Sequence, residues 1–138
     1  MKVLHIVENF NGQAIERWLL QLVNEARNRG EHVDWTFFCT LEVAGNQSEM
    51  MTSLGGKVIC SSYPITRPLL FMKGLRDVVR KGHYDIVHSH HDIMSALYLF
   101  ALVGLPIHKR IIHVHNTSLS LPTSNNFKMI IGKFIFKR

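Results

Sequence analysis

The sequence feature that most constrains the fold is a strand, turn and helix unit at the N-terminus. Residues 2–7 form a short, almost unbroken apolar run, KVLHIV, in which apolar and polar residues do not alternate. Such a run is typical of a parallel strand that is covered on both faces. A turn over residues 8–13 follows, and apolar residues then recur at helical spacing from Ala14 to Ala26, ahead of Gly30, where we expect the helix to end. This order predicts the opening unit of a doubly wound α/β domain.

The alternation of strand and helix continues along the chain. We expect strands at residues 32–39, 57–60, 84–88 and 110–115, and helices at residues 46–54, 68–82, 92–103 and 127–136. Asp92 is expected to cap its helix, Leu69 and Leu70 to be buried, and Glu16 to lie among the polar residues of the first helix. Right-handed crossovers then predict a Rossmann-like parallel sheet of order 3-2-1-4-5 in one domain over residues 1–138.

Composition and charge limit the ligands that the protein is expected to bind and the cellular compartment in which it is expected to lie. A hydrophobic fraction of 46% supports a real core, and the net charge of +6 suits anionic ligands or an anionic membrane surface. The basic residues are dispersed, without an aromatic-basic stripe, so we expect no nucleic-acid partner. The two cysteines, Cys39 and Cys60, form no disulfide framework, and the apolar run after Lys2 is too short for a secretory leader. We therefore expect a cytoplasmic protein.

The turn before the first helix is a candidate ligand site. Gly12 and Gln13 precede the helix N-terminus, where free backbone N–H groups suit a phosphate or a sugar hydroxyl. An ordinary Asn/Gly turn is the alternative, and spacing alone favours it. Dinucleotide binding is disfavoured, because Gly12 is the only glycine in the turn and no acidic residue closes the second strand.

Histidines gather where the fourth and fifth strands should end, namely His88, His90, His91, His113 and His115. They could bind a metal, contact a substrate or transfer a proton, or simply bond to neighbouring backbone. We expect no metal, because the H-E-x-x-H, C-x-x-C and facial-triad spacings are all absent. The ordinary structural role is favoured for His88 and His113, whereas a functional role is equally open for His90 and His115.

The segment at residues 127–138 combines apolar and basic residues. A basic amphipathic helix can lie on an anionic membrane, but a core-facing helix of an incomplete domain is preferred here. Because Ile135 and Phe136 point away from the apolar stripe between Ile130 and Phe134, we also expect this segment to mediate self-association.

Four stretches together resemble the amino-terminal, acceptor-side domain of a GT-B fold, retaining glycosyltransferase of the family 4 type. They are residues 2–8 (KVLHIVE), 14–20 (AIERWLL), 84–90 (YDIVHSH) and 112–116 (IHVHN). Family members carry a glycine pair before the Ile/Ala-Glu step of the first loop. The matching positions here are Gln13 and Ala14, with Gly12 one residue early.

The resemblance implies which residues meet the substrates. His115 matches the family's functional histidine, which faces the transferred sugar and is the expected catalytic residue, with Asn116 beside it. His90 matches a histidine near the acceptor, and the loop at Gly12 and Gln13 is expected to bind substrate. The implied reaction transfers a sugar from a nucleotide-sugar, used as a substrate and not as a cofactor, to a glycan or lipid-linked acceptor. Cell-surface polysaccharide synthesis, at the inner face of the membrane, is the expected setting.

The resemblance implies that the first domain is truncated before its last elements, and nothing after His115 resembles the second, donor-binding domain of such enzymes. We therefore expect this chain alone to be inactive. The alternative is a non-catalytic α/β binding or interaction module that kept the fold.

Overall fold

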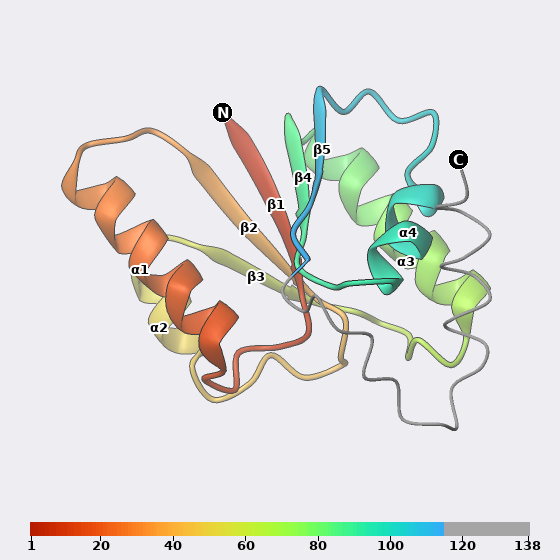
Figure 1. The fold of residues 1–138 in the computed structure, drawn as a ribbon, viewed down its shortest axis with the longest axis horizontal. Helices are drawn as coiled ribbons and strands as arrows, with labels where there is room; N and C mark the ends of the chain where they lie inside the picture. The colour runs from red at the N-terminus through yellow and green to blue at the C-terminus, as the bar shows by residue number, and fades with distance from the viewer. Residues whose placement is uncertain (115–138) are drawn as a thin grey trace.

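The computed structural model describes residues 1–114, which form a five-stranded parallel sheet with helices on both faces (Figure 1). The strands are β1 (Lys2–Val7), β2 (Asp34–Cys39), β3 (Lys57–Cys60), β4 (Ile86–Ser89) and β5 (Lys109–Ile112). The helices are α1 (Ala14–Asn28), α2 (Ser48–Ser53), α3 (Pro68–Gly82) and α4 (Met94–Ala101). The expected C-terminal helix and the residues His115 and Asn116 lie outside the described part of the chain.

The sheet has the order β3-β2-β1-β4-β5, which confirms the Rossmann-like prediction. Strand β1 is central and pairs with β2 on one side and β4 on the other. In this register His5 lies opposite Phe37 of β2 and opposite His88 of β4. The switch of direction along the chain therefore falls between β1 and β4, at whose carboxyl ends a ligand is expected to bind.

Strand β1 sends alternate side chains to two separate cores, because successive residues of a strand point to opposite faces. Leu4 and Ile6 pack with residues of α3 and α4, whereas Val7 packs in a second cluster with residues of α1 and α2. Figure 1 shows α1 and α2 on one side of the sheet and α3 and α4 on the other. His5, two residues before Val7, therefore points into the layer beneath α1.

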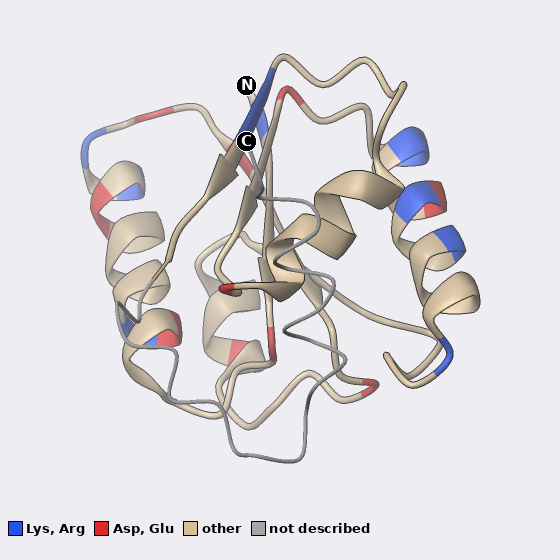
Figure 2. Ribbon diagram, turned by 45° about the vertical axis from the view of Figure 1, so that its right-hand side comes forward, with Lys and Arg blue, Asp and Glu red and all other residues tan. Residues whose placement is uncertain are grey.

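Charged residues occur mainly in α1, in α3 and near the ends of the strands (Figure 2), and most of those in the two helices are exposed or half-buried. The polar faces that periodicity predicts are therefore largely correct, with two corrections. Glu16 is buried at 3% exposure, because the first turn of α1 meets the loops at the end of the sheet. Leu69 and Leu70 are exposed, at 81% and 40%, because the buried face of α3 is the row Phe71, Leu75 and Val79, and the two leucines lie off that row.

Several expected boundaries also shift by one to three residues. β5 ends at Ile112, so His113 follows the strand, and β4 runs from Ile86 to Ser89. The N-cap residue of α4 is Ile93, and Asp92, the expected cap, lies one position before it. Within residues 1–114, no helix is both long and apolar enough to span a membrane.

Candidate functional site

The loop that joins β1 to α1 is held by the loop that follows β2. The Phe10 N–H donates to the Ala44 carbonyl oxygen at 2.7 Å, and the Gln47 N–H donates to the Phe10 carbonyl oxygen at 2.9 Å. The Phe10 side chain is fully buried, so it fixes the loop to the core beneath α1. These contacts place the next residues, Gly12 and Gln13, at the carboxyl end of β1.

Gly12 and Gln13 lie in the turn before α1, where the sequence predicts a candidate ligand site. Gly12 has φ +85°, in the region that favours glycine, and a Cβ there would lie 2.8 Å from Gln47 Nε2. Gln13 is the N-cap of α1 and has an extended backbone, but its side chain makes no capping hydrogen bond. Gln13 therefore begins α1 without a side-chain cap, and a ligand role for this turn stays a prediction.

Glu16 is a buried acid that the sequence reasoning left on the polar face of α1. Burial raises the pKa of its carboxyl, and the backbone N–H groups of Gln13 and Glu16 oppose that shift. Its Oε2 has no hydrogen-bond partner among the described residues. The sequence does carry a signal for this position, namely the distance of Glu16 from the N-cap. An acid three residues after the N-cap reaches back toward the helix start, as in a capping box.

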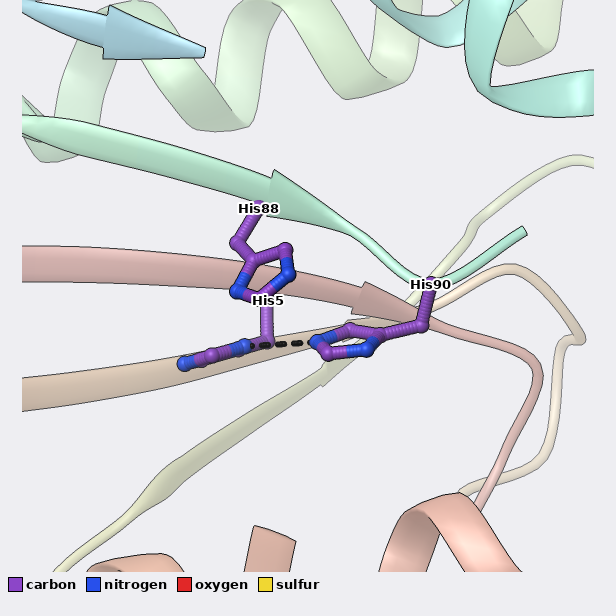
Figure 3. Close-up of side chains that lie close together, drawn as sticks. All are labelled: His5, His88 and His90. Carbon is purple, nitrogen blue, oxygen red and sulfur yellow. Dashed lines mark hydrogen bonds between the residues drawn. The ribbon is translucent and has the colours of Figure 1, made fainter. Parts of the chain in front are cut away.

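Beneath α1, histidines from β1, β4 and the segments after β4 and β5 lie together. The centroid of the His88 ring is 5.1 Å from that of His5, 4.1 Å from that of His90 and 5.7 Å from that of His113. His5 Nδ1 and His90 Nε2 are 2.9 Å apart and share a buried hydrogen bond (Figure 3). Trp18 of α1 covers the outer side, with ring centroids 6.0 Å from His90 and 5.9 Å from His113. His88, His90 and His113, which the sequence placed near the strand ends, thus lie together with His5, whereas the His91 ring contacts that of Tyr98, with centroids 5.3 Å apart.

His5 is the most buried member of this cluster and is 2% exposed. Its ring lies between the aromatic rings of Trp35 and Phe37 on one side and those of the other histidines on the other. Burial, and secondarily the charge that His88 could carry, lowers the pKa of His5 to about 3. At neutral pH His5 is therefore a neutral imidazole, able to donate and accept one hydrogen bond each.

A cavity of about 70 Å³ opens beside this cluster, at the carboxyl end of β1. Its lining consists of Val7, Glu8, Gln13, Ile15, Glu16, His90 and His91. The structure thus brings together Gln13 and His90, two residues that the sequence placed in the site, and adds Glu16. Gly12 precedes Gln13 but does not line the cavity, and the positions of His115 and Asn116 lie outside the described residues.

A larger hollow, of about 460 Å³, lies along α2 and β3. Its lining includes Ser48, Glu49 and Thr52 and no histidine. We place the functional site at the smaller cavity because buried titratable groups converge there, at the switch point of the sheet. The same region holds a group of possible metal ligands, since one nitrogen from each of His5, His88 and His90 lies within 4.8 Å of the others.

A parallel Rossmann-like sheet with polar groups at its switch point defines a class of α/β domains that bind ligands at the carboxyl ends of their strands. A family model narrows this class: that of Glycosyltransferase Family 4 matches residues 15–138. The chain belongs to this family. A search of curated proteins found no match, and neither did a search of solved structures.

Proposed function

We propose that this chain is the acceptor-side domain of a retaining, GT-B type glycosyltransferase. The observation that carries the proposal is the cavity at the end of β1, which joins Gln13, Glu16 and His90 in a chain of this family. Polar groups that converge on a small hollow beside a helix N-terminus suit the hydroxyl groups of a sugar. In this assignment residues 1–138 form one domain, and a second domain supplies most of the donor site.

The reaction that follows moves a sugar from a nucleotide-sugar to a glycan or lipid-linked acceptor. The bond between the sugar's anomeric carbon and the diphosphate oxygen breaks, and the acceptor oxygen forms the new bond to that carbon. The acceptor's proton is taken up by the departing nucleoside diphosphate or by solvent. The nucleotide-sugar is a substrate, so the proposal needs no resident cofactor. The net charge of +6 suits such an anionic donor.

Each site residue takes a distinct part in this proposal. His90 and the loop at Gly12 and Gln13 contact the acceptor, while His115 faces the transferred sugar as the catalytic residue and Asn116 lies next to it in the chain. We place the reaction at the inner face of the cytoplasmic membrane, in cell-surface polysaccharide synthesis. The basic segment 127–138 is then the surface that touches the membrane or a second copy of the chain.

Binding of the acceptor tests the proposal directly. The purified chain is titrated with a panel of glycans and lipid-linked oligosaccharides, and binding is followed by ligand-observed NMR. We expect His90→Gln to weaken binding about tenfold, because loss of one buried hydrogen bond costs about 1–3 kcal/mol and 1.4 kcal/mol is tenfold. His108→Gln is the matched control, since His108 is exposed and far along the chain from the cavity lining.

Two outcomes would contradict the proposal. Equal binding by both variants would place the acceptor elsewhere on the domain. Absence of any glycan or lipid-linked ligand, combined with capture of another ligand class by the same cavity, would favour a non-catalytic interaction module instead.

The chain alone is expected to transfer no sugar. One wall of a two-domain cleft cannot position donor and acceptor together, and that positioning supplies much of the rate of such a reaction. A radiolabelled nucleotide-sugar assay measures this, with a protein-free blank to subtract hydrolysis. Transfer above the blank by residues 1–138 would refute the expectation.

A further inference from the structure

The buried histidines of β1 and β4 lie in an arrangement that a metal ion could use. His5 and His88 are register partners on neighbouring strands, and His90 follows two residues after His88 on the same face. One ring nitrogen from each of the three lies within 4.8 Å of the others. Figure 3 shows the three rings gathered at the carboxyl ends of these strands.

We propose that His5, His88 and His90 form a binding site for a divalent transition-metal ion, with zinc as the best fit. Three imidazole nitrogens plus one exchangeable ligand is a common zinc coordination set. An all-imidazole set also suits cobalt, nickel or copper, but it does not suit magnesium or calcium, which prefer oxygen ligands.

Two of the three ligand nitrogens would need to move only slightly to bind a zinc ion. With Zn–N bonds of 2.0–2.1 Å and tetrahedral angles, two ligand nitrogens lie about 3.3 Å apart. His5 Nδ1 and His90 Nε2 are already 2.9 Å apart, so they would need to separate by about 0.4 Å. The proton on the donor nitrogen of this pair would pass to the other nitrogen of its own ring, so that both imidazoles stay neutral and each offers a lone pair to the metal. His88 would close from within 4.8 Å by rotation of its side chain.

The surroundings favour a fixed site over a chance encounter. His5 and His90 are only 2% and 5% exposed, and the rings of Trp35 and Phe37 stack on His5. Ligands held by packing lose little conformational freedom when they bind, which makes the site preorganised. A metal bound here would be enclosed by the sheet, in contrast to the exposed histidines His32 and His108.

A second feature points to a cation at the same place. Of the three histidines, His90 lines the adjacent cavity, whose volume of about 70 Å³ is enough for a water molecule, so a fourth ligand would approach the ion from the His90 side. Glu16 lines this cavity as well, is 97% buried, and has an Oε2 atom without a hydrogen-bond partner in the described part of the chain. A buried acid of this kind offers an acceptor for a metal-bound water and a negative charge to balance the ion.

This proposal reverses the expectation of no metal that the sequence supported. That expectation rested on local spacing, whereas the hydrogen-bonded pair His5 and His90 is separated by 85 residues in the chain. Only the parallel pairing of β1 with β4 brings the three histidines together.

Metal titration without any sugar tests the proposal, so that its failure would leave the proposed transferase function untouched. Chelator-treated protein is titrated with cobalt chloride and then with zinc chloride. We expect one cobalt ion per chain with the visible absorption of a tetrahedral complex, displaced by one equivalent of zinc. His5→Gln, His88→Gln and His90→Gln should each weaken binding at least a hundredfold, and His108→Gln should leave it unchanged.

Ring-nitrogen NMR of the unsubstituted protein avoids any dependence on whether the variants fold. Zinc should shift the imidazole signals of His5, His88 and His90 together, at one equivalent, and magnesium should shift none of them. Binding retained by all three folded variants would overturn the proposal. So would zinc shifts confined to exposed histidines such as His32 and His108, or the absence of stoichiometric binding.

Discussion

Replacement of Gly45 by alanine should disrupt the contact that positions the loop between β1 and α1. Gly45 lies between Ala44, which accepts a hydrogen bond from Phe10, and Gln47, which donates one to Phe10. Together with the bond from the Leu41 N–H to the Glu8 carbonyl oxygen, these two bonds link the loop after β2 to the loop that carries Gly12. The substitution therefore tests whether the candidate site is shaped by a neighbour distant in sequence.

The size of the effect follows from the backbone geometry. Gly45 has φ +90°, and an alanine Cβ would lie 2.5 Å from the carbonyl carbon and oxygen of Phe10, whereas ordinary contact begins at 3.4 Å. Positive φ costs an alanine about 1–2 kcal/mol. Relief of the clash moves the loops apart by about 0.9 Å and weakens two hydrogen bonds worth about 0.5–1.5 kcal/mol each. We expect a loss of about 2–5 kcal/mol in the free energy of unfolding.

Gly55→Ala is the matched control. Gly55 has φ +93°, nearly the same conformation, but an added Cβ would meet no atom within 4 Å. Its substitution should cost only the conformational term of about 1–2 kcal/mol. The difference between the two variants isolates the clash with Phe10 from the backbone preference.

Urea unfolding followed by circular dichroism gives both free energies, and amide hydrogen exchange locates the change. Gly45→Ala should speed exchange at the amides of Phe10 and Gln47, and Gly55→Ala should not. Equal destabilisation of the two variants, or unchanged protection of Phe10 and Gln47, would refute the reasoning.

Three further results are expected. Cys39 and Cys60 should titrate as two free thiols in unfolded, unreduced protein; in the native protein Cys39 should react slowly with alkylating reagents, because burial raises its pKa to about 12. Burial raises the pKa of Glu16 above its ordinary 4.5, so the native state holds a proton that the unfolded chain releases. The free energy of unfolding should then fall as pH rises from 4.5 through the folded pKa, and Glu16→Gln should remove that fall in urea titrations across pH. Light scattering at micromolar concentration should show a dimer or larger species, and removal of residues 127–138 should give a monomer.

The sequence predicts most of the fold because residues that end helices and strands mark the boundaries of the elements. The third strand, Lys57–Cys60, and the helix Pro68–Gly82 have the predicted bounds, since glycines and a proline mark their limits. The sheet order follows from the alternation of strand and helix with right-handed crossovers. The expected burial is wrong at Leu69, because Phe71, Leu75 and Val79 form the buried row of its helix and Leu69 lies off it. It is wrong at Glu16, because periodicity gives the apolar face of a helix but not where neighbouring loops cover its end.

The candidate site is only partly visible in the sequence. His90 and Gln13 carry local signals, and the structure places both at one cavity. His5 carries none, because a single histidine in an apolar strand has the appearance of a core residue. Its role depends on the pairing of β1 with β4 and on the stacking of rings beneath α1, and neither is encoded in local spacing.

Two buried polar atoms at one end of the sheet indicate that this end was not shaped by stability alone. His5 Nε2 and Glu16 Oε2 have no hydrogen-bonding protein partner among residues 1–114. An unmet buried polar group costs about 1–3 kcal/mol, and apolar residues at these positions would avoid that cost. Such local conflicts with stability gather at functional sites. Both atoms therefore favour the carboxyl end of β1 as the functional site of the domain. A ligand there, whether an acceptor hydroxyl or a metal-bound water, would give Glu16 the partner that the protein does not supply.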